Sequence, residues 1–302
     1  MKIAVAIATV GRPQILGHAI RDLARQTRQP DRTIISATSF DDVDPSILSD
    51  RPARIDIIYG GRGLPRQRNA VLDALGDEDV VLFLDDDFMM APDFLCRLEE
   101  LMSAQPSIGI VTGDVLADGI GNAGLTPPQA QTILDRAMDE PCPDLSDLID
   151  VNNGYGCNMA FRCAPIRTHG LRFDEQLPLY AWLEDVDFSR RAAAYGRCVK
   201  AMALRGVHLG IKGGRTSGVR LGYSQVANPI YLIGRATMQR RHAARLISRN
   251  IAANLAKSLW SEPWVDRRGR LHGNLLALAD LIRGRIDPLR VLDLESRNNG
   301  RS

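Results

Sequence analysis

The stretch Val80-Val81-Leu82-Phe83-Leu84-Asp85-Asp86-Asp87 decides the fold, because five apolar residues run directly into three acidic ones. A short apolar run of this kind is typical of a strand buried on both faces of a parallel sheet. Three adjacent carboxylates repel one another at the end of such a strand unless a cation balances them. Mg²⁺ and Mn²⁺ prefer oxygen ligands and also bind phosphates, so the triplet predicts a divalent metal beside a phosphate-bearing ligand. The alternative interpretation is an exposed acidic turn, since Asp is a common turn residue.

The segments before the triplet alternate between strand and helix patterns. Apolar runs predict strands at residues 3–8, 33–37 and 55–59, and helical patterns begin at Pro13 and cover residues 64–75. Such alternation implies right-handed crossovers, and it predicts an α/β fold with a Rossmann-like, mostly parallel sheet and helices on both faces. Ligands of such sheets bind outside the carboxyl ends of the strands, which places the acidic triplet on the binding rim.

The remainder of the chain is expected to complete this domain and add a helical extension. Strands are predicted at residues 108–113, 154–162 and 198–204, and helices at residues 92–103 and 185–195, with a variable insertion at 119–143. From Pro229 to Leu259 the pattern is helical and basic, and a last helix is expected over residues 271–283. We therefore predict one domain over residues 1–225, divided into a nucleotide-binding half (1–115) and an acceptor half (116–225), and a helical basic C-terminal extension over residues 226–302.

The distribution of charge and the spacing of the cysteines limit which ligands and which cellular location we expect. The net charge of +2 gives no indication of nucleic-acid binding, but residues 188–261 hold 14 Lys and Arg and no Asp or Glu. Such a basic segment suits a phosphate-bearing ligand or an anionic membrane surface, and the alternative is a solvated basic face. The five scattered cysteines have no paired spacing and suggest reduced thiols in the cytoplasm. No stretch approaches about 20 apolar residues, so any membrane contact is expected to be peripheral.

Several motifs occur in the order found in one enzyme family. They are Ile7-Ala8-Thr9, Gly63-Leu64-Pro65-Arg66-Gln67-Arg68-Asn69-Ala70, Phe83-Leu84-Asp85-Asp86-Asp87, Gly156-Cys157-Asn158-Met159-Ala160-Phe161-Arg162, Trp182-Leu183-Glu184-Asp185-Val186-Asp187-Phe188-Ser189-Arg190-Arg191 and His208. In this ordered set, which covers about residues 1–210, the chain resembles a family 2 glycosyltransferase with the GT-A fold. The resemblance implies an inverting, metal-dependent transfer of a sugar from a nucleoside diphosphate sugar, with a UDP-sugar as the expected donor and Mn²⁺ or Mg²⁺ as cofactor.

The resemblance also implies which residues bind the donor. Asp87 and His208 are the expected metal ligands, Asp85 is the expected ribose contact, and Asp86 assists the metal or shapes the turn. The other expected nucleotide contacts are Thr9, Arg12, Asp42 (or its neighbour Asp41), Arg66, Arg68 and Asn69. In the family an acidic residue usually follows the second strand directly, whereas here Ser36-Ala37-Thr38-Ser39 intervenes.

On the acceptor side, Glu184 and Asp185 match the family's acidic pair. An inverting transfer needs a carboxylate that takes the proton of the attacking hydroxyl, and we assign this role to Asp185, with Glu184 orienting the acceptor or acting as the base itself. The alternative is that both only stabilise a helix N-terminus. Asn153, Tyr155 and Trp182 are candidates for an acceptor surface, because aromatic faces suit sugar rings.

The segment 210–222 is rich in glycine and is predicted to be a mobile lid over the diphosphate. Its cations are Lys212, Arg215 and Arg220. The basic helices at 229–264 suggest contact with an anionic membrane, which would suit a lipid-linked or growing saccharide acceptor in polysaccharide or glycoconjugate synthesis. The expected location is the cytoplasm, with possible peripheral contact to the inner face of the cell membrane.

Three other classes compete with this interpretation. A nucleotidyltransferase that makes sugar nucleotides carries a glycine-rich phosphate loop after the first strand, whereas Thr9-Val10-Gly11-Arg12-Pro13 has one glycine. A dinucleotide-binding oxidoreductase is disfavoured, because no GxGxxG motif follows the first strand. A non-catalytic protein that only binds sugar nucleotides is the third possibility, and the retained Asp85, Asp87 and Asp185 argue against it.

Overall fold

The computed structural model describes residues 1–48, 54–212, 216–260 and 262–294, which form two compact units. The first unit comprises Met1–Arg62, Arg66–Arg172 and Phe188–Gly214. The second comprises Gly63–Pro65, Phe173–Asp187 and the described residues beyond 214. A short segment from the middle of the chain therefore belongs with the C-terminal helices.

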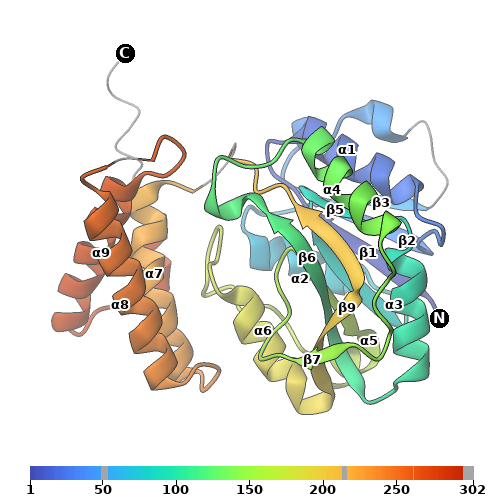
Figure 1. Ribbon diagram of the computed structural model, residues 1–302. Coiled ribbons are helices and arrows are strands. Elements are labelled where there is room, and N and C mark those ends of the chain that lie inside the picture. The colour runs from blue at the N-terminus through green and yellow to red at the C-terminus, as the bar shows by residue number, and fades with distance from the viewer. Residues whose placement is uncertain (49–53, 213–215, 261, 295–302) are drawn as a thin grey trace. The chain divides into compact units, whose positions relative to one another are not determined.

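Nine strands of the described residues form one sheet in the first unit (Figure 1). They are β1 Ile3–Ala8, β2 Arg32–Ala37, β3 Ile55–Tyr59, β4 Val80–Asp85, β5 Phe88–Met90, β6 Ile108–Asp118, β7 Leu148–Asp150, β8 Asn158–Arg162 and β9 Arg197–His208. The order is β3-β2-β1-β4-β8-β6-β9-β5, and β7 pairs with β9. Strands β3, β2, β1 and β4 are parallel, as are β6 and β9, while β8, β5 and β7 run antiparallel to their neighbours. The predicted strand–helix alternation is confirmed, and β5 and β7 are additions.

Helices cover both faces of this sheet, because alternate residues of the central strands face opposite sides. On one face, Val5 and Leu82 share a core cluster with Leu16 of α1 (Pro13–Ala24) and Leu98 of α3 (Phe94–Ala104). On the other face, the ring of Phe83 lies edge-on to Phe161, which in turn packs edge-on against Phe188 of α6 (Glu184–Ala192). The remaining α-helices around the sheet are α2 Leu64–Ala74, α4 Pro127–Asp139 and α5 Cys163–His169.

The second unit is built on three helices, α7 Gly218–Gly234, α8 Arg240–Lys257 and α9 Arg267–Ile282. Helix α7 begins where the side chain of Ser217 accepts a hydrogen bond from the Arg220 amide, and it continues through Pro229. The prediction of a helix start at Pro229 was wrong, because this proline lies in the interior of α7. The predicted domain boundary between residues 225 and 226 also falls inside this helix. None of the helices in the described parts of the chain is long and apolar enough to cross a membrane.

Candidate metal and nucleotide site

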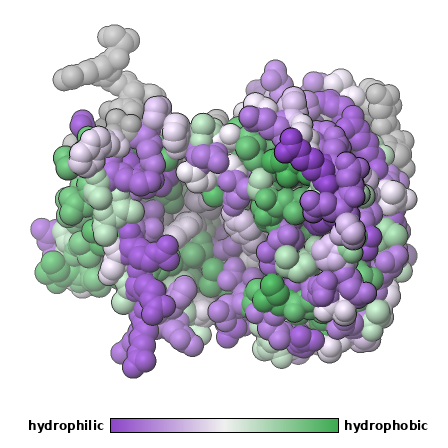
Figure 2. Space-filling view, in the orientation of Figure 1, coloured by the Kyte–Doolittle hydropathy of each residue, from purple (hydrophilic) through white to green (hydrophobic). Residues whose placement is uncertain are grey.

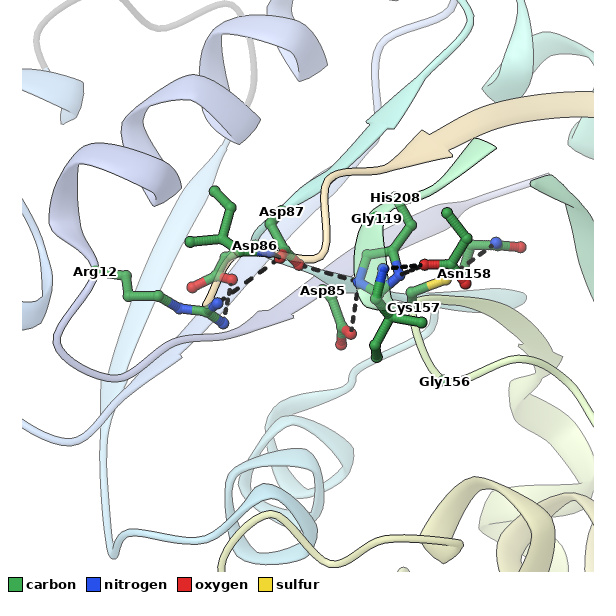
Figure 3. A network of polar contacts seen from close by, with 12 residues as sticks. Arg12, Asp85, Asp86, Asp87, Gly119, Gly156, Cys157, Asn158 and His208 are labelled. Carbon is green, nitrogen blue, oxygen red and sulfur yellow. Dashed lines mark hydrogen bonds and ion pairs between the residues drawn. The ribbon is translucent and has the colours of Figure 1, made fainter. Parts of the chain in front are cut away.

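The acidic triplet lies at the carboxyl end of β4, as the sequence predicts, and the carboxylate of Asp86 points away from the other two (Figure 3). The strand ends at Asp85, whose amide donates to the carbonyl of Cys157 at 3.1 Å. Asp85 and Asp87 face His208, which terminates β9, whereas Asp86 turns toward Arg12. The turn at Asp86 and Asp87, between β4 and β5 Phe88–Met90, thus separates a ligand pair from a residue that holds the loop.

Asp85, Asp87 and His208 form a cluster that fits a divalent metal. One ligand atom from each lies within 4.8 Å of the others. Nε2 of His208 is 3.4 Å from a carboxylate oxygen of Asp87 and 4.0 Å from one of Asp85. Two carboxylates and an imidazole are donors that Mn²⁺ accepts, and the buried charge of Asp87 would be balanced by the ion. The structure therefore brings Asp85, the predicted ribose contact, into the same group as the predicted metal ligands.

A residue that sequence reasoning missed, Asp118, orients the imidazole of His208. Strands β6 and β9 place Asp118 opposite His208, and Oδ1 of Asp118 lies 2.9 Å from Nδ1 of the ring. The hydroxyl of Tyr155 donates to the other oxygen of Asp118 at 2.7 Å. A carboxylate behind a metal-binding histidine fixes its ring orientation, so Nε2 is left to face Asp85 and Asp87. Tyr155 supports Asp118 through its hydroxyl, and its predicted contact with an acceptor stays a prediction.

The local pKa values reflect this crowding of charge in the metal-free protein. Burial favours neutral His208, but the hydrogen bonds to Asp118 and Asp87 and the nearby charges outweigh it and raise the pKa of His208 to about 10. Burial also opposes the ionised form of Asp118, yet hydrogen bonds from His208, Tyr155 and the Ile120 amide lower its pKa to about 2. The imidazolium thus occupies the place of a cation among the carboxylates.

Asp86 holds the first loop to the triplet. It is fully buried, with the hydroxyl of Thr9 donating to it at 2.7 Å and the guanidinium of Arg12 pairing with it at 2.5 Å. Burial raises the pKa of Asp86 to about 7 despite Arg12. Arg12 also lies 3.8 Å from Asp87. Thr9 and Arg12, predicted to contact the nucleotide, are therefore used to fix the loop after β1, and any contact of theirs with the donor stays a prediction.

The carboxylate of Asp42 is held by hydrogen bonds within the protein, and its contact with a nucleotide stays a prediction. Its carboxylate accepts hydrogen bonds from the Gly11 amide at 2.6 Å, from the amide and hydroxyl of Thr38, and from the Ser39 amide. Burial opposes ionisation, but these donors lower the pKa of Asp42. The four hydrogen bonds use the acceptor capacity of a carboxylate, so Asp42 ties the β1 and β2 loops together. Its neighbour Asp41 is exposed.

The first turns of α2 bring two buried polar side chains to the rim. Arg68 donates to the carbonyl of Gly156 at 2.8 Å and lies 3.5 Å from Asp85. Gln67, which was not among the predicted contacts, donates to the carbonyls of Thr9 and Ser36, near the carboxyl ends of β1 and β2. Of the other two predicted contacts in this segment, Arg66 is exposed and Asn69 is buried. Their roles toward a nucleotide stay predictions.

The chain after β9 returns to the metal cluster. The Ile211 amide donates to Asp87 at 2.8 Å, and the Lys212 ammonium donates to the carbonyls of Gly119 and Ile120 at 2.9 Å each. Gly119 and Gly210 cross so closely that a Cβ on Gly119 would lie 1.9 Å from the Leu209 carbonyl oxygen. This crossing requires glycine and fixes the segment that carries Lys212.

The predicted lid over residues 210–222 is corrected in its second half. Residues from Gly218 onward form helix α7, and Arg220 within it donates to the carbonyls of Leu294 and Leu292. Arg215 lies outside the described residues. A role of Lys212 toward a diphosphate stays a prediction.

The acceptor-side acidic pair, Glu184 and Asp185, lies in the second unit, in the segment Phe173–Asp187. Glu184 is buried at the start of α6, and Asp185 is partly exposed. Before them the backbone is left-handed at three non-glycine positions, Leu179 (φ 59°), Ala181 (φ 50°) and Leu183 (φ 76°). Such conformations cost of order 1–3 kcal/mol each and persist only where the surroundings impose them. Trp182 lies within this stretch, whereas Asn153 lies in the first unit and donates to the Gly154 carbonyl.

Comparison with known proteins assigns the chain to a family. The profile described as glycosyl transferase family 2 matches residues 4–169, which is more than half of the sequence. The chain belongs to glycosyl transferase family 2. The match includes the acidic triplet and the predicted nucleotide-binding half, and it confirms the resemblance drawn from the motifs. Among curated proteins, none matches the sequence.

Solved structures of glycosyltransferases share the fold of this family 2 chain. A Staphylococcus aureus TarS fragment, residues 1–349 in complex with UDP-GlcNAc, is 14% identical and has a TM-score of 0.56, with 96% of this chain and 83% of that chain covered. A Pyrobaculum calidifontis mannosyltransferase, PcManGT in complex with GDP-Man and Mn²⁺, is 16% identical with a TM-score of 0.55, covering 96% and 78%. The chain spans 44% of a longer TarS structure, at 14% identity and a TM-score of 0.50. The GT-A fold predicted from the sequence is confirmed.

Proposed function

We propose that this protein is a metal-dependent, inverting glycosyltransferase that moves a sugar from a nucleoside diphosphate sugar to a hydroxyl of a saccharide or lipid-linked saccharide. The observation that carries the proposal is the cluster of Asp85, Asp87 and His208 at the carboxyl end of β4, with Asp118 orienting the imidazole. Asp87 and His208 would hold Mn²⁺ or Mg²⁺ together with Asp85. The bound ion would neutralise the charge that develops on the leaving diphosphate.

The chain's own residues divide the remaining work between donor and acceptor. Arg68 and the rim formed by the β1 and β2 loops hold the nucleotide, and Lys212 lies in the segment that follows the metal ligand His208. Asp185 takes the proton from the acceptor hydroxyl as its oxygen attacks the anomeric carbon and the bond to the nucleoside diphosphate breaks. Partial exposure of Asp185 supports this choice over the buried Glu184, because a base must touch the acceptor.

A thermal-shift screen tests the proposal. The probes are UDP, GDP, UDP-GlcNAc and GDP-Man, each with and without Mn²⁺, since the related structures hold UDP-GlcNAc and GDP-Man. A ligand that binds only the folded state raises the melting temperature, so nucleotides of one base should stabilise the protein only when Mn²⁺ is present. Release of nucleoside diphosphate from the stabilising sugar nucleotide should follow. A folded protein that responds to none of these probes would refute the proposal.

The same screen separates the competing functions. A non-catalytic sugar-nucleotide-binding protein would show the Mn²⁺-dependent stabilisation without release of nucleoside diphosphate. A nucleotidyltransferase would instead release pyrophosphate from a nucleoside triphosphate and a sugar phosphate. Membership of glycosyl transferase family 2 favours neither of these alternatives.

The second unit also carries a surface suited to an anionic membrane, and we include peripheral attachment at the cytoplasmic face in the proposal. Arg241, Arg245 and Arg249 are exposed at four-residue spacing on α8. Beyond the end of this helix, Leu259 and Trp260 are 74% and 77% exposed. Figure 2 shows apolar side chains on the surface of this helical unit. Basic and apolar side chains on one helical element are the composition of interfacial membrane helices.

Flotation with vesicles tests the attachment. Vesicles with anionic lipid should carry the protein and neutral vesicles should not, and Trp260→Glu should weaken flotation without changing donor binding. Absence of binding to anionic vesicles would exclude the membrane contact while leaving the catalytic proposal intact.

A further inference from the structure

The segment that carries Glu184 and Asp185 packs with the C-terminal helices and forms one compact unit with them. Leu177 and Ala181 of this segment share a buried apolar cluster with Leu232 of α7, Met238 between α7 and α8, and Ala243 in the first turn of α8. Leu183 and Val186, the neighbours of the acidic pair, pack against the same cluster. The C-terminal helices are thus part of the support of the acceptor-side acidic pair.

Two hydrogen bonds, one partly buried and one buried, fix this segment on either side of the acidic pair. Before the pair, the side-chain amide of Asn228 on α7 donates to the carbonyl of Trp182 at 2.7 Å. After the pair, the hydroxyl of Thr237, between α7 and α8, donates to the carboxylate of Asp187 at 2.9 Å. Asn228 is 1% exposed and Asp187 is fully buried, so the loss of either bond would leave a buried polar group without its partner.

The backbone between these two bonds needs such external support. Leu179, Ala181 and Leu183 have left-handed conformations that L-residues avoid. Trp182, whose carbonyl receives the Asn228 amide, lies between the last two of them. A hydrogen bond from a buried amide within this unfavourable stretch favours that conformation over the extended alternatives, and it thereby sets the direction in which α6 begins.

We propose that Thr237 and Asn228 are positioning residues for the acceptor-side carboxylates, so that the C-terminal helices set the geometry of proton transfer. This inference rests on the proposed function of Asp185 as the base. Neither residue is expected to touch the sugar donor, the metal or the acceptor. Each acts through the segment 182–187, Asn228 by fixing its entry and Thr237 by fixing the first turn of α6.

The first test measures the segment itself and does not depend on activity. Thr237→Val removes the hydroxyl with little change of volume, and Thr237→Ser keeps it. Tyr223→Phe is the matched control, because Tyr223 of α7 also donates a buried hydroxyl, at 2.9 Å, but to Asp280 of α9. In hydrogen exchange, peptides covering residues 181–187 should exchange about 10-fold faster in Thr237→Val than in the wild type, and at the wild-type rate in Thr237→Ser and Tyr223→Phe. Unchanged exchange of these peptides in Thr237→Val would overturn the proposal.

The second test measures chemistry, as release of nucleoside diphosphate from whichever of UDP-GlcNAc and GDP-Man stabilises the protein with Mn²⁺. Thr237→Val should lower kcat about 10- to 100-fold with an unchanged KM for the donor, since a small misplacement of a catalytic group has effects of this size. Thr237→Ser should restore kcat. In an Asp185→Asn background, Thr237→Val should cause no further loss, because the base through which Thr237 acts is gone.

The outcomes distinguish the two proposals. If Asp185→Asn leaves turnover unchanged, the role of Asp185 fails, whereas altered exchange in Thr237→Val would still show that Thr237 fixes the segment. If Asp185→Asn abolishes turnover and Thr237→Val does not lower kcat, the positioning role fails and the function of Asp185 stands. Losses that multiply in the double variant would also overturn the positioning role.

Discussion

Oδ1 of Asp118 lies 2.9 Å from Nδ1 of His208, although 90 residues separate them in the sequence. The pairing of β6 with β9 brings them opposite each other, and Tyr155 holds the second oxygen of the carboxylate. The imidazole is therefore fixed from behind, and Nε2 faces the carboxylates of Asp85 and Asp87. The candidate metal cluster is thus supported by two further residues, Asp118 and Tyr155, whose supporting roles the sequence motifs do not reveal.

Asp118→Asn should weaken metal binding while the protein stays folded. The amide cannot carry the charge that raises the basicity of His208, and loss of such a partner typically costs about 10- to 100-fold in metal affinity. Titration calorimetry with Mn²⁺ measures the change. Asp114→Asn is the matched control, because Asp114 lies on the same strand but pairs with Lys200 at 2.6 Å, outside the metal cluster. Equal Mn²⁺ affinity in the wild type and Asp118→Asn would contradict the role of Asp118.

Mn²⁺ binding should release about one proton per site near pH 7.5. The pKa of His208 is raised to about 10 in the metal-free protein, so the ring is protonated at neutral pH and must lose its proton to coordinate the ion. Apparent affinity should therefore rise about tenfold per pH unit on going from pH 6 toward the pKa of His208. Calorimetry in two buffers with different ionisation enthalpies counts the protons. A binding enthalpy that is the same in both buffers would rule out His208 as a ligand.

The same pKa predicts how metal-free protein responds to alkali. The folded-state pKa of His208 exceeds the ordinary value of 6.5, so its ionisation stabilises the fold fully below about pH 6.5. This contribution is lost progressively as the pH rises from there through about 10. The urea midpoint of metal-free protein should fall over that interval, and His208→Gln should flatten the dependence. A midpoint of the wild type that does not fall between pH 7 and 10 would contradict the expectation.

Gly119→Ala should disrupt the crossing between the end of β6 and the end of β9. The added Cβ would lie 1.9 Å from the Leu209 carbonyl oxygen. The amide of the same residue, Leu209, donates a hydrogen bond to the Asp87 carbonyl, so a shift of Leu209 would also move Asp87. We expect a loss of about 1–3 kcal/mol in the free energy of unfolding, together with weakened Mn²⁺ binding. Gly121→Ala is the control, since its Cβ would meet no atom within 4 Å. Similar urea midpoints for the two variants would refute this reading of the crossing.

Local patterns in the sequence predict the parallel half of the sheet well. The strands at Ile3–Ala8 and Ile55–Tyr59 have the predicted bounds, because compact apolar runs between turn residues leave few alternatives. The acidic triplet can also be recognised from the local sequence, because carboxylates directly after a buried strand need a partner of opposite charge. The short strands Phe88–Met90 and Leu148–Asp150 escape prediction, because three residues carry too little periodicity and both depend on pairing with β9.

The contacts that support the candidate site cannot be predicted from the local sequence. Asp118 is one of many acidic residues until β6 pairs with β9. Glycines at 218 and 222 suggested a lid, but they allow α7 to pack tightly, since a Cβ on Gly222 would lie 2.0 Å from the Arg270 carbonyl oxygen of α9. In both cases the deciding partner lies far away in the sequence.

Asp185→Asn should abolish transfer while leaving donor binding intact. An amide cannot take the proton of the attacking hydroxyl, and loss of general-base catalysis typically lowers turnover about 10²- to 10⁴-fold. The Mn²⁺-dependent thermal shift with the nucleotide should match that of the wild type, because the predicted ligands Asp87 and His208 are unchanged. Glu184→Gln is the companion variant, since Glu184 is only 4% exposed and is expected to support the fold of the segment more than to meet the acceptor. Loss of turnover in Glu184→Gln with near-normal turnover in Asp185→Asn would assign the base to Glu184 instead.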